Sequence, residues 1–305
     1  MLHFIVNPAS STGNGKKKWE AIEKRLTETN TAYKLYTTTG TDSARQFAAQ
    51  ITAIDAPVTI AVLGGDGTIN EVLTGFRDYS LVTLGYIPAG SSNDLARDLK
   101  LPKDPIEALD IILHPKEFTY MDIGKIQYEG GERNFGVSTG IGFDAAICHE
   151  ALHSPLKNTL NKLHLGKLTY VGIALKQLIR TKRHGCTVYL DGSREIHFSR
   201  FYFVTCMVHK YEGGGFMFCP EADYKDGYLD VCVAGNISKP GVLGLLPTAY
   251  KGGHTRVRGI GIYRSKKVVI AADSLLPVHA DGESCGMQAK ITMTQEEKQL
   301  RVIIR

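Results

Sequence analysis

The sequence predicts two domains: an α/β N-terminal domain with a parallel sheet, and a C-terminal domain that is mainly an antiparallel β-sandwich. Strand-like and helix-like segments alternate over roughly the first 115 residues, the order that builds a parallel sheet with helices on its faces. From Phe118 onward, strands dominate. The length of 305 residues, with 43% hydrophobic content, suits roughly two domains. The change of pattern places the boundary at Asp122, giving domains 1–122 and 123–305, and the last strand can return to the first domain.

The N-terminal elements follow from apolar runs and helical spacing. The run Val58–Leu63 is uniformly apolar, as a central parallel strand is. The predicted strands are Leu2–Asn7, Tyr33–Thr38, Val58–Leu63 and Val82–Ile87. The predicted helices are Lys16–Thr29, Ser43–Ile54, Asn70–Phe76, Asn93–Leu99 and one that begins at Pro105. Asp104 can cap this last helix, with Pro105 at its first position and Glu107 closing a capping box.

The second half is predicted to consist mainly of antiparallel strands with helical insertions. The predicted strands are Gly124–Tyr128, Asn134–Ser138, Thr187–Leu190, Glu195–Ser199, Arg200–Val208, Gly227–Ala234, Lys266–Ala272 and Gln299–Ile304. Glu129–Glu132 is the predicted turn of one hairpin, and Asp191-Gly192 is a strong signal for another. The basic segment Lys157–Arg183 is predicted to be mostly helical. A solvated amphipathic helix is its ordinary interpretation, and attraction to anionic lipid headgroups is the second.

Composition and charge narrow the classes of protein. The net charge of +5 permits an anionic partner such as a nucleotide or a lipid surface without requiring one, and we expect no nucleic-acid partner. None of the six cysteines forms a C-x-x-C pair, so we expect free, mostly buried thiols. No apolar run approaches the ~18 residues of a membrane span, and we expect no secretory signal. The expected location is therefore the cytoplasm.

The strongest local motif is Gly64-Gly65-Asp66-Gly67-Thr68, which follows the strand Val58–Leu63 and precedes a helix. Its glycines allow a sharp turn and a close approach to a ligand, and amide N–H groups at a helix N-terminus suit phosphate oxygens. Asp66 stands at the carboxyl end of a central strand, where open α/β sheets bind ligands. A cation that bridges it to the phosphates would explain a carboxylate there. The alternative is a tight turn with an incidental aspartate.

Two further loops follow predicted strands. Pro88–Arg97 contains Gly90 and then Ser91 and Ser92, either of which can bind phosphate or cap the helix. Asn93 and Asp94 would lie in the first helical turn, at the positive end of the helix dipole; an ordinary capped helix is the alternative. Asn7–Lys16 is a loop of small polar residues that enters a lysine-rich helix. It is not a P-loop, because Ser10 stands where the first P-loop glycine would be. It can bind a nucleotide, or it can be a solvated loop.

Together these motifs resemble the catalytic domain of the diacylglycerol and sphingosine kinase superfamily. The matching patterns are Asn-Pro-x-Ser, Gly-Gly-Asp-Gly-Thr-x-Asn-Glu and Pro-x-Gly-(Thr/Ser)-x-Asn-Asp-x-Ala-Arg. The second half looks like that of the small bacterial lipid kinases, so the resemblance runs from Asn7 to Glu283. It implies a Rossmann-like first domain of the kind seen in NAD kinase and phosphofructokinase, which binds the nucleotide. The second domain would then hold the lipid substrate.

The resemblance also implies which residues form the site. Asp66 and Asp94 match active-site acids, and Glu283 matches the general base. The residues that match nucleotide contacts are Asn7, Pro8, Ala9, Ser10, Ser11, Thr38, Gly65, Asp66, Gly67, Thr68, Ile69, Asn70, Glu71 and Ser91. The residues that match a magnesium site are Asp223, Asp226 and Tyr228, with Asp122 matching an acid near it. Thr37 or Thr39 could serve in place of Thr38. Without the resemblance, both Asp223–Gly227 and Asp281-Gly282 would be interpreted as routine turns.

The implied activity is phosphoryl transfer from ATP, with Mg²⁺, to the hydroxyl of diacylglycerol or a related lipid alcohol. Asp66 would hold the magnesium ion, and Glu283 would accept the proton of the lipid hydroxyl. The alternatives are a kinase of a soluble alcohol such as NAD, and a non-catalytic regulator that binds nucleotide or lipid. We expect the enzyme to reach the lipid by transient peripheral association with the membrane. Sheet edges in the second domain could also pair between subunits to form a homodimer. His149, His153 and His164 match no compact metal site.

Overall fold

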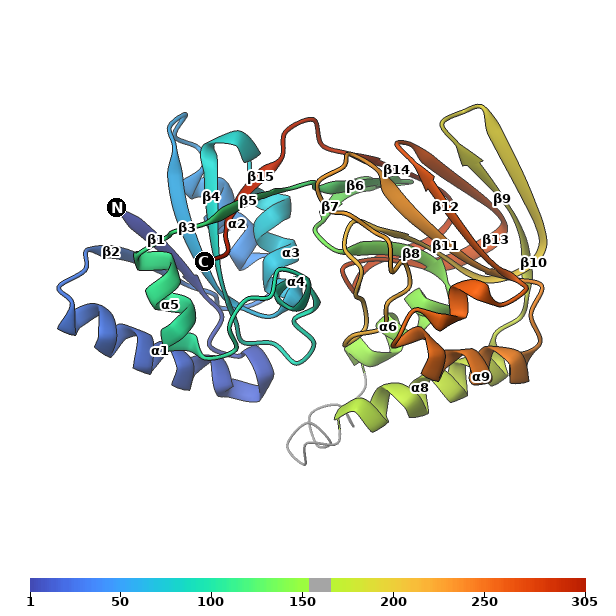
Figure 1. The fold of residues 1–305 in the computed structure, drawn as a ribbon, viewed down its shortest axis with the longest axis horizontal. Coiled ribbons are helices and arrows are strands. Elements are labelled where there is room, and N and C mark those ends of the chain that lie inside the picture. Colours follow the sequence, from blue (N-terminus) through green and yellow to red (C-terminus); the bar gives the residue numbers. More distant parts are fainter. Residues whose placement is uncertain (154–165) are drawn as a thin grey trace. The chain divides into compact units, whose positions relative to one another are not determined.

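The computed structural model describes residues 1–153 and 166–305 (Figure 1). The chain divides into two compact units. The first comprises residues 1–123 and 296–305, and the second comprises residues 124–295. The C-terminal strand therefore belongs to the first unit.

The first unit is a six-stranded sheet in the order β2-β1-β3-β4-β15-β5. All neighbouring pairs are parallel except β15 and β5, which are antiparallel. The strands are β1 (Leu2–Val6), β2 (Tyr33–Thr37), β3 (Val58–Gly64), β4 (Val82–Pro88), β5 (Phe118–Met121) and β15 (Leu300–Ile303). The helices are α1 (Ser10–Glu28), α2 (Ser43–Ile51), α3 (Asp66–Gly75), α4 (Asp94–Asp98), α5 (Pro105–Leu113) and the 3₁₀ turn η1 (Tyr79–Leu81).

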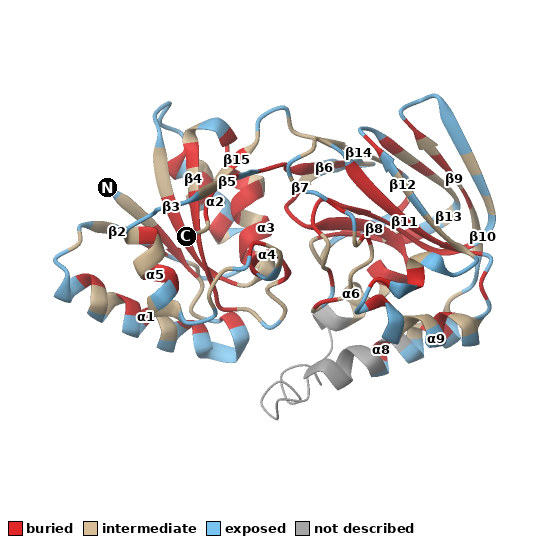
Figure 2. Cartoon of the chain, in the orientation of Figure 1, coloured by how far each residue is buried: buried red, intermediate tan, exposed pale blue. Residues whose placement is uncertain are grey.

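The parallel sheet forms because its central strands are buried on both faces, as their apolar sequence predicts. From Ile60 to Gly64 every residue of β3 is buried (Figure 2). Helix α5 begins where the capping signal predicts, because a carboxylate oxygen of Asp104 accepts the N–H groups of Ile106 and Glu107 at 2.9 and 3.0 Å. The parallel sheet with helices on its faces confirms the predicted α/β class for this unit.

The second unit is a nine-stranded antiparallel sheet that folds over onto itself. The strands are β6 (Gly124–Tyr128), β7 (Gly131–Phe135), β8 (Ser138–Gly142), β9 (His184–Leu190), β10 (Arg194–Met207), β11 (Leu229–Gly235), β12 (Ile260–Ser265), β13 (Val268–Ala280) and β14 (Glu283–Gln295). The helices are α6 (Phe143–His153), α8 (Gly166–Arg180), α9 (Lys239–Ala249) and the 3₁₀ turn η2 (Gly253–Arg256).

Two long strands make the fold-over possible. The first part of β10 pairs with β9 and its last part pairs with β8, with a register shift between Phe198 and Phe201. Strand β13 likewise pairs first with β9 and then with β8, and a register shift lies between Ala271 and Leu276. Such irregularities bend strands and let one sheet supply two layers. Apolar side chains of these layers form a core between them, which confirms the predicted β-sandwich, and a second apolar cluster joins β10 and β11 to helices of this unit.

Several predicted boundaries in this unit are wrong. The predicted turn Glu129–Glu132 is shorter, because Tyr128 pairs with Gly131 and only two residues lie between them. The predicted strand Asn134–Ser138 covers only the last two residues of β7 and the first residue of β8. The segments predicted as Glu195–Ser199 and Arg200–Val208 form the single strand β10. Beyond Ser138, strand β8 has no sequence prediction, and neither do β12, β14, α6, α9 and η2. The predicted helical segment Lys157–Arg183 lies partly outside the described residues, and so does His164.

Candidate active site

Two glycine turns meet at the carboxyl edge of the first sheet. Strands β3 and β4 are parallel neighbours in which Gly64 pairs with Pro88, so the turns after them emerge side by side. The N–H of Ala89 donates to the carbonyl of Gly64 at 2.7 Å. A Cβ placed on Gly90 would lie 2.6 Å from the Cα of Gly65, which is closer than any real side chain tolerates. The glycines are required because the two backbones touch.

The acidic residues of the two turns are joined by a hydrogen bond. Oδ1 of Asp66 accepts the backbone N–H of Asp94 at 3.0 Å. Asp94 is only 4% exposed, and its carboxylate lies 3.4 Å from Nε of Arg97. Asn93 closes the second turn, because its side chain accepts the N–H of Gly90 and donates to the carbonyl of Gly90, both at 2.8 Å. The two predicted active-site acids are thus held in one rigid arrangement.

The loop after β1 reaches the first glycine turn. Nδ2 of Asn7 donates to Oγ1 of Thr68 at 2.9 Å. The backbone at Ser11, Thr12 and Gly13 is left-handed, with φ of 50°, 59° and 91°. Left-handed conformation is uncommon for residues with a side chain. This loop therefore holds an unusual backbone conformation where it enters α1.

A lysine links this loop's helix to the second glycine turn. Lys18 lies on α1, and its Nζ donates to the carbonyl of Pro88 at 2.6 Å. Burial lowers the pKa of Lys18, and the charge of Asp104 opposes this shift. The sequence does not single out this residue within the basic run 16–18, because the contact depends on the distance between α1 and the end of β4.

The remaining predicted nucleotide contacts divide into loop and helix positions. The N–H of Thr38 donates to the carbonyl of Val6 at 2.9 Å, which places Thr38 just past the end of β2, and Ser91 is exposed. Ile69 and Asn70 are buried in α3. The carboxylate of Glu71 is engaged elsewhere, because it accepts the N–H groups of Asp42 and Ala44, both at 3.1 Å, at the start of α2. Glu71 therefore holds α2 against α3.

The predicted magnesium turn follows a different pattern of contacts. Oδ2 of Asp226 forms an ion pair with Arg264 at 3.0 Å, and its Oδ1 accepts the N–H of Tyr228 at 3.0 Å. The carbonyl of Tyr228 accepts Nε2 of Gln295 at 3.0 Å. Oδ1 of Asp223 accepts the N–H of Lys225 at 3.1 Å. Carboxylate and carbonyl oxygens suit a hard cation, and Arg264 and Gln295 already contact two of these groups.

Asp122 belongs to the first unit. It is buried at the end of β5, and its Oδ1 accepts Nε2 of Gln299 at 2.8 Å. This bond ties the returning C-terminal segment to the sheet.

Glu283 is the first residue of β14, directly after a two-residue turn. Asp281 and Gly282 have φ of 50° and 84°, as a tight hairpin turn requires. The Asp281 carboxylate accepts three backbone N–H groups, those of Gly136, Val137 and Ser138, at 2.7, 2.8 and 2.9 Å. The turn that carries the predicted base is thus fixed to the connection between β7 and β8.

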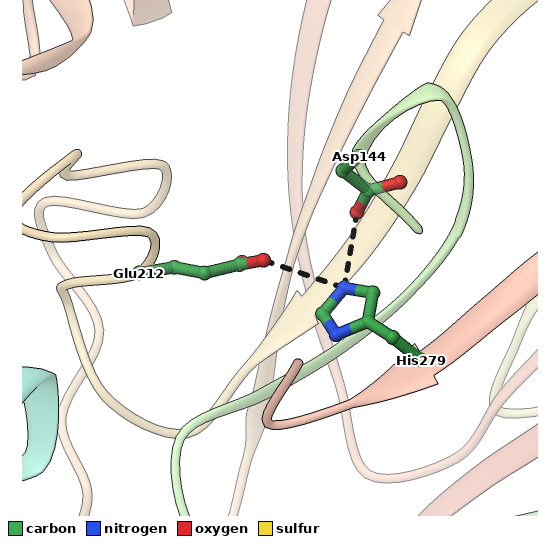
Figure 3. Close-up of side chains that lie close together, drawn as sticks. All are labelled: Asp144, Glu212 and His279. Atoms are coloured by element: carbon green, nitrogen blue, oxygen red, sulfur yellow. Dashed lines mark hydrogen bonds and ion pairs between the residues drawn. The ribbon is translucent and has the colours of Figure 1, made fainter. Parts of the chain in front are cut away.

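A buried cluster beside this turn has no counterpart in the sequence prediction. Nε2 of His279 lies 3.3 Å from Oδ2 of Asp144 and 3.3 Å from Oε1 of Glu212 (Figure 3). These three residues are the one group in the described part of the chain with the spacing of a metal site. No motif joins them, because they come from α6, from the loop after β10 and from β13. The only available signal was the position of His279 two residues before Asp281.

Comparisons with known proteins agree with this architecture. Residues 1–126 match the diacylglycerol kinase catalytic domain, and residues 138–304 match the YegS C-terminal NAD kinase beta sandwich-like domain. A diacylglycerol kinase of Mycobacterium tuberculosis is 34% identical over 236 residues, covering 76% of this chain and 73% of that protein.

Solved structures share the whole fold. A protein from Bacillus anthracis described as a "putative diacylglycerol kinase" superposes with a TM-score of 0.76 at 22% identity, covering 99% of this chain and 96% of that one. An NAD kinase from Archaeoglobus fulgidus, solved with ATP, gives a TM-score of 0.53 at 14% identity, with 99% and 93% coverage. These likenesses confirm the predicted NAD kinase-like fold.

The fold and the paired glycine turns define a two-domain kinase with an NAD kinase-like first domain. The chain belongs to the diacylglycerol kinase family.

Proposed function

We propose that this kinase transfers the γ-phosphoryl group of ATP to the hydroxyl of diacylglycerol or a related lipid alcohol. The contact between Gly65 and Gly90, which brings Asp66 and Asp94 together, is the observation that carries the proposal. It supports a site where phosphates can approach the backbone and negative charge can be neutralised. Family membership supports the lipid acceptor.

In this proposal ATP binds along the carboxyl edge of the first sheet. The N–H groups of the glycine turn and of the left-handed loop at Ser11 would receive its phosphates, and Lys18 adds positive charge nearby. Asn7 and Thr68 would act by holding the first loop against α3. Thr38 and Ser91 remain proposed contacts, whereas Glu71 contributes by fixing α2.

Most of the rate enhancement in phosphoryl transfer comes from positioning and charge neutralisation. Magnesium, held by Asp66 directly or through water, would supply the charge neutralisation at the phosphates. We propose that the Glu283 carboxylate accepts the proton of the lipid hydroxyl as that oxygen attacks. A general base of this kind contributes ~10²–10⁴-fold.

We also propose a second magnesium site at Asp223, Asp226 and the carbonyl of Tyr228, with Asp122 as the acidic residue that the family resemblance assigns near it. The oxygen ligands are of the right kind. The positive charge of Arg264 beside Asp226 competes with a cation for that carboxylate. Isothermal titration with magnesium should therefore show tighter binding in Arg264→Ala, and equal binding would count against this site.

A kinase of a soluble alcohol such as NAD is the second candidate. The NAD kinase-like fold favours it, and the same glycine turns would serve it. ATP labelled at the γ-phosphate, incubated with a panel of lipids beside NAD, separates the two candidates. We expect label in the lipid phase, and label that enters only the NAD fraction would reject the lipid kinase.

The lipid must be reached at a membrane surface, and we propose transient peripheral association. Among the described helices, none combines the length and the apolar composition needed to cross a bilayer. Cosedimentation with anionic and neutral vesicles tests the association, and size-exclusion chromatography with light scattering tests the homodimer.

A further inference from the structure

The cluster of Asp144, Glu212 and His279 raises a question of charge. The three side chains are buried, and both carboxylates approach the same nitrogen, Nε2 of His279, at 3.3 Å (Figure 3). Two carboxylates out of water need compensation by a cation or by protons. Either a metal ion belongs between these residues, or the histidine and one acid share protons there.

The hydrogen bond at Nδ1 of His279 distinguishes a bound metal ion from shared protons. Nδ1 accepts the backbone N–H of Gly282 at 3.1 Å, so Nδ1 carries a lone pair and the proton of the neutral ring sits on Nε2. A histidine that binds a metal does the reverse, because its second nitrogen donates a hydrogen bond. Turning the ring over would put carbon atoms in both polar contacts. The geometry therefore favours a proton, rather than a metal, between Nε2 and the carboxylates.

The second proton of the cluster belongs on Glu212. Burial raises the pKa of the Glu212 carboxyl to about 7, although Oγ1 of Thr205, which donates to its Oε2 at 3.2 Å, favours the ionised form and opposes this shift. Burial lowers the pKa of His279, although the hydrogen bond to Asp144 and the nearby carboxylates raise it overall. A second proton on the ring would occupy Nδ1 and break the bond to Gly282. The raised pKa, about 9, would favour the charged ring, but the bond from Gly282 requires a bare Nδ1, so the geometry favours the neutral ring.

The space for this cluster is built into the sheet. A Cβ on Gly140 of β8 would lie 2.1 Å from Oδ2 of Asp144 and 2.9 Å from Nε2 of His279. Any other residue at this position would displace both groups. Asp144 and Glu212 therefore hold the ring at Nε2. The lone pair of Nδ1 is directed at the turn that leads to Glu283 and accepts the N–H of Gly282 there.

We propose that His279 is a positioning residue for Glu283. Its Nε2–H, anchored by Asp144 and Glu212, fixes the ring so that Nδ1 holds the N–H of Gly282 and sets the direction in which Glu283 leaves the turn. The titratable groups that face the ring are Asp144, Glu212 and Asp281. The inference rests on the proposed role of Glu283 as the base, and it assigns His279 no contact with substrate.

Two substitutions of His279 test the roles of Nδ1 and Nε2 separately. In His279→Asn the side-chain oxygen can take the place of Nδ1 and accept the N–H of Gly282. In His279→Gln the amide can take the place of Nε2, and the acceptor for Gly282 is lost. We expect His279→Asn to retain kcat within about threefold of wild type. We expect His279→Gln to lose ~10²-fold in kcat, because small displacements of a catalytic group cost that much. The KM for ATP should stay unchanged in both.

The two variants of His279 must differ in kcat if Nδ1 positions the turn. Equal losses of kcat in the two variants, or a greater loss in His279→Asn, would overturn the positioning role. Because either variant can fold poorly, ¹⁵N NMR of the imidazole in the wild-type protein supplies a test without mutation. We expect an unprotonated Nδ1 and a protonated Nε2, and a proton on Nδ1 would overturn the proposal. If wild type transfers no phosphate to lipid, the proposed function fails, while the NMR result still reports on the ring.

Discussion

The backbone N–H of Asp94 donates to Oδ1 of Asp66 across 3.0 Å, and this bond joins the turns that follow two neighbouring parallel strands. A carboxylate fixed in this way can hold a cation against phosphates without reorganising during the reaction.

The negative charge of Asp66 should matter more for catalysis than the shape of its side chain. We expect Asp66→Asn to lower kcat by more than ~10²-fold and to weaken the dependence on magnesium, because the amide can still accept from Asp94 but carries no charge. Steady-state kinetics over a range of magnesium concentrations measures both effects. Asp110→Asn, which removes a half-exposed partner of Arg25, is the matched control. Unchanged magnesium dependence in Asp66→Asn would contradict the assignment.

The contact between the two glycine turns predicts a steric effect. In Gly90→Ala the new Cβ would lie 2.6 Å from the Cα of Gly65 and 2.7 Å from Oδ1 of Asn93, so the turns must separate. We expect KM for ATP to rise ~10-fold or more, because the phosphate-binding backbone is displaced. In Gly40→Ala the Cβ would meet nothing within 4 Å, and ATP kinetics should match wild type. Equal behaviour of the two variants would show that the contact is not needed.

Glu283 should act in the chemical step alone. We expect Glu283→Gln to lose ~10²–10⁴-fold in turnover while its affinity for ATP stays at the wild-type value. Turnover assays with lipid and equilibrium binding of ATP provide the two numbers. Turnover near that of wild type would remove Glu283 from the role of base.

The Asp281 carboxylate should stabilise the second unit. It accepts three backbone N–H groups, and in Asp281→Asn the amide group would face some of these donors. We expect a loss of about 3 kcal/mol in the free energy of unfolding, measured by denaturant titration. Asp273→Asn is the control, because that carboxylate is more than half exposed and accepts the N–H of Gly185. If Asp281→Asn loses no more unfolding free energy than Asp273→Asn, the three bonds to Asp281 do not stabilise the unit as expected.

The protonation of Glu212 predicts a dependence of stability on pH. Burial raises its pKa to about 7 in the folded protein, compared with about 4.3 in an unfolded chain. The folded state therefore keeps a proton that the unfolded chain loses. The resulting stabilisation is full below about pH 4 and is lost as the pH rises through about 7.

A comparison of wild type with Glu212→Gln isolates the pH-dependent stabilisation that comes from the Glu212 carboxyl. Between about pH 5 and pH 8 the thermal midpoint of wild type should fall further than that of the variant, whose side chain cannot titrate. Parallel curves would mean that Glu212 carries no proton.

The sequence predicted the part of the site that depends on local geometry. Glycines before Asp66 and before Asp94 mark turns after apolar strands, and strands adjacent in a parallel sheet bring their turns together. The role of Glu71 was not predictable, because its partners, the N–H groups of Asp42 and Ala44, lie 29 and 27 residues earlier in the chain.

Long-range pairing explains the other omissions. The cluster around His279 joins residues as far as 135 positions apart, and nothing in the local pattern of Asp144 or Glu212 distinguishes a buried acid from an exposed one. Strand β8 was missed because Ser138–Gly142 is short and glycine-containing. Its burial between β10 and β13 arises only when both long strands bend.

We propose that this protein moves a phosphoryl group from ATP to a lipid hydroxyl. Mass-spectrometric identification of the products after incubation with ATP, magnesium and a total lipid extract tests this transfer directly. We expect phosphorylated lipid, formed in an amount equal to the ADP released and reduced more than ~10²-fold with Asp66→Asn. ADP release without any phosphorylated lipid, or phosphate found only on a water-soluble alcohol, would contradict it.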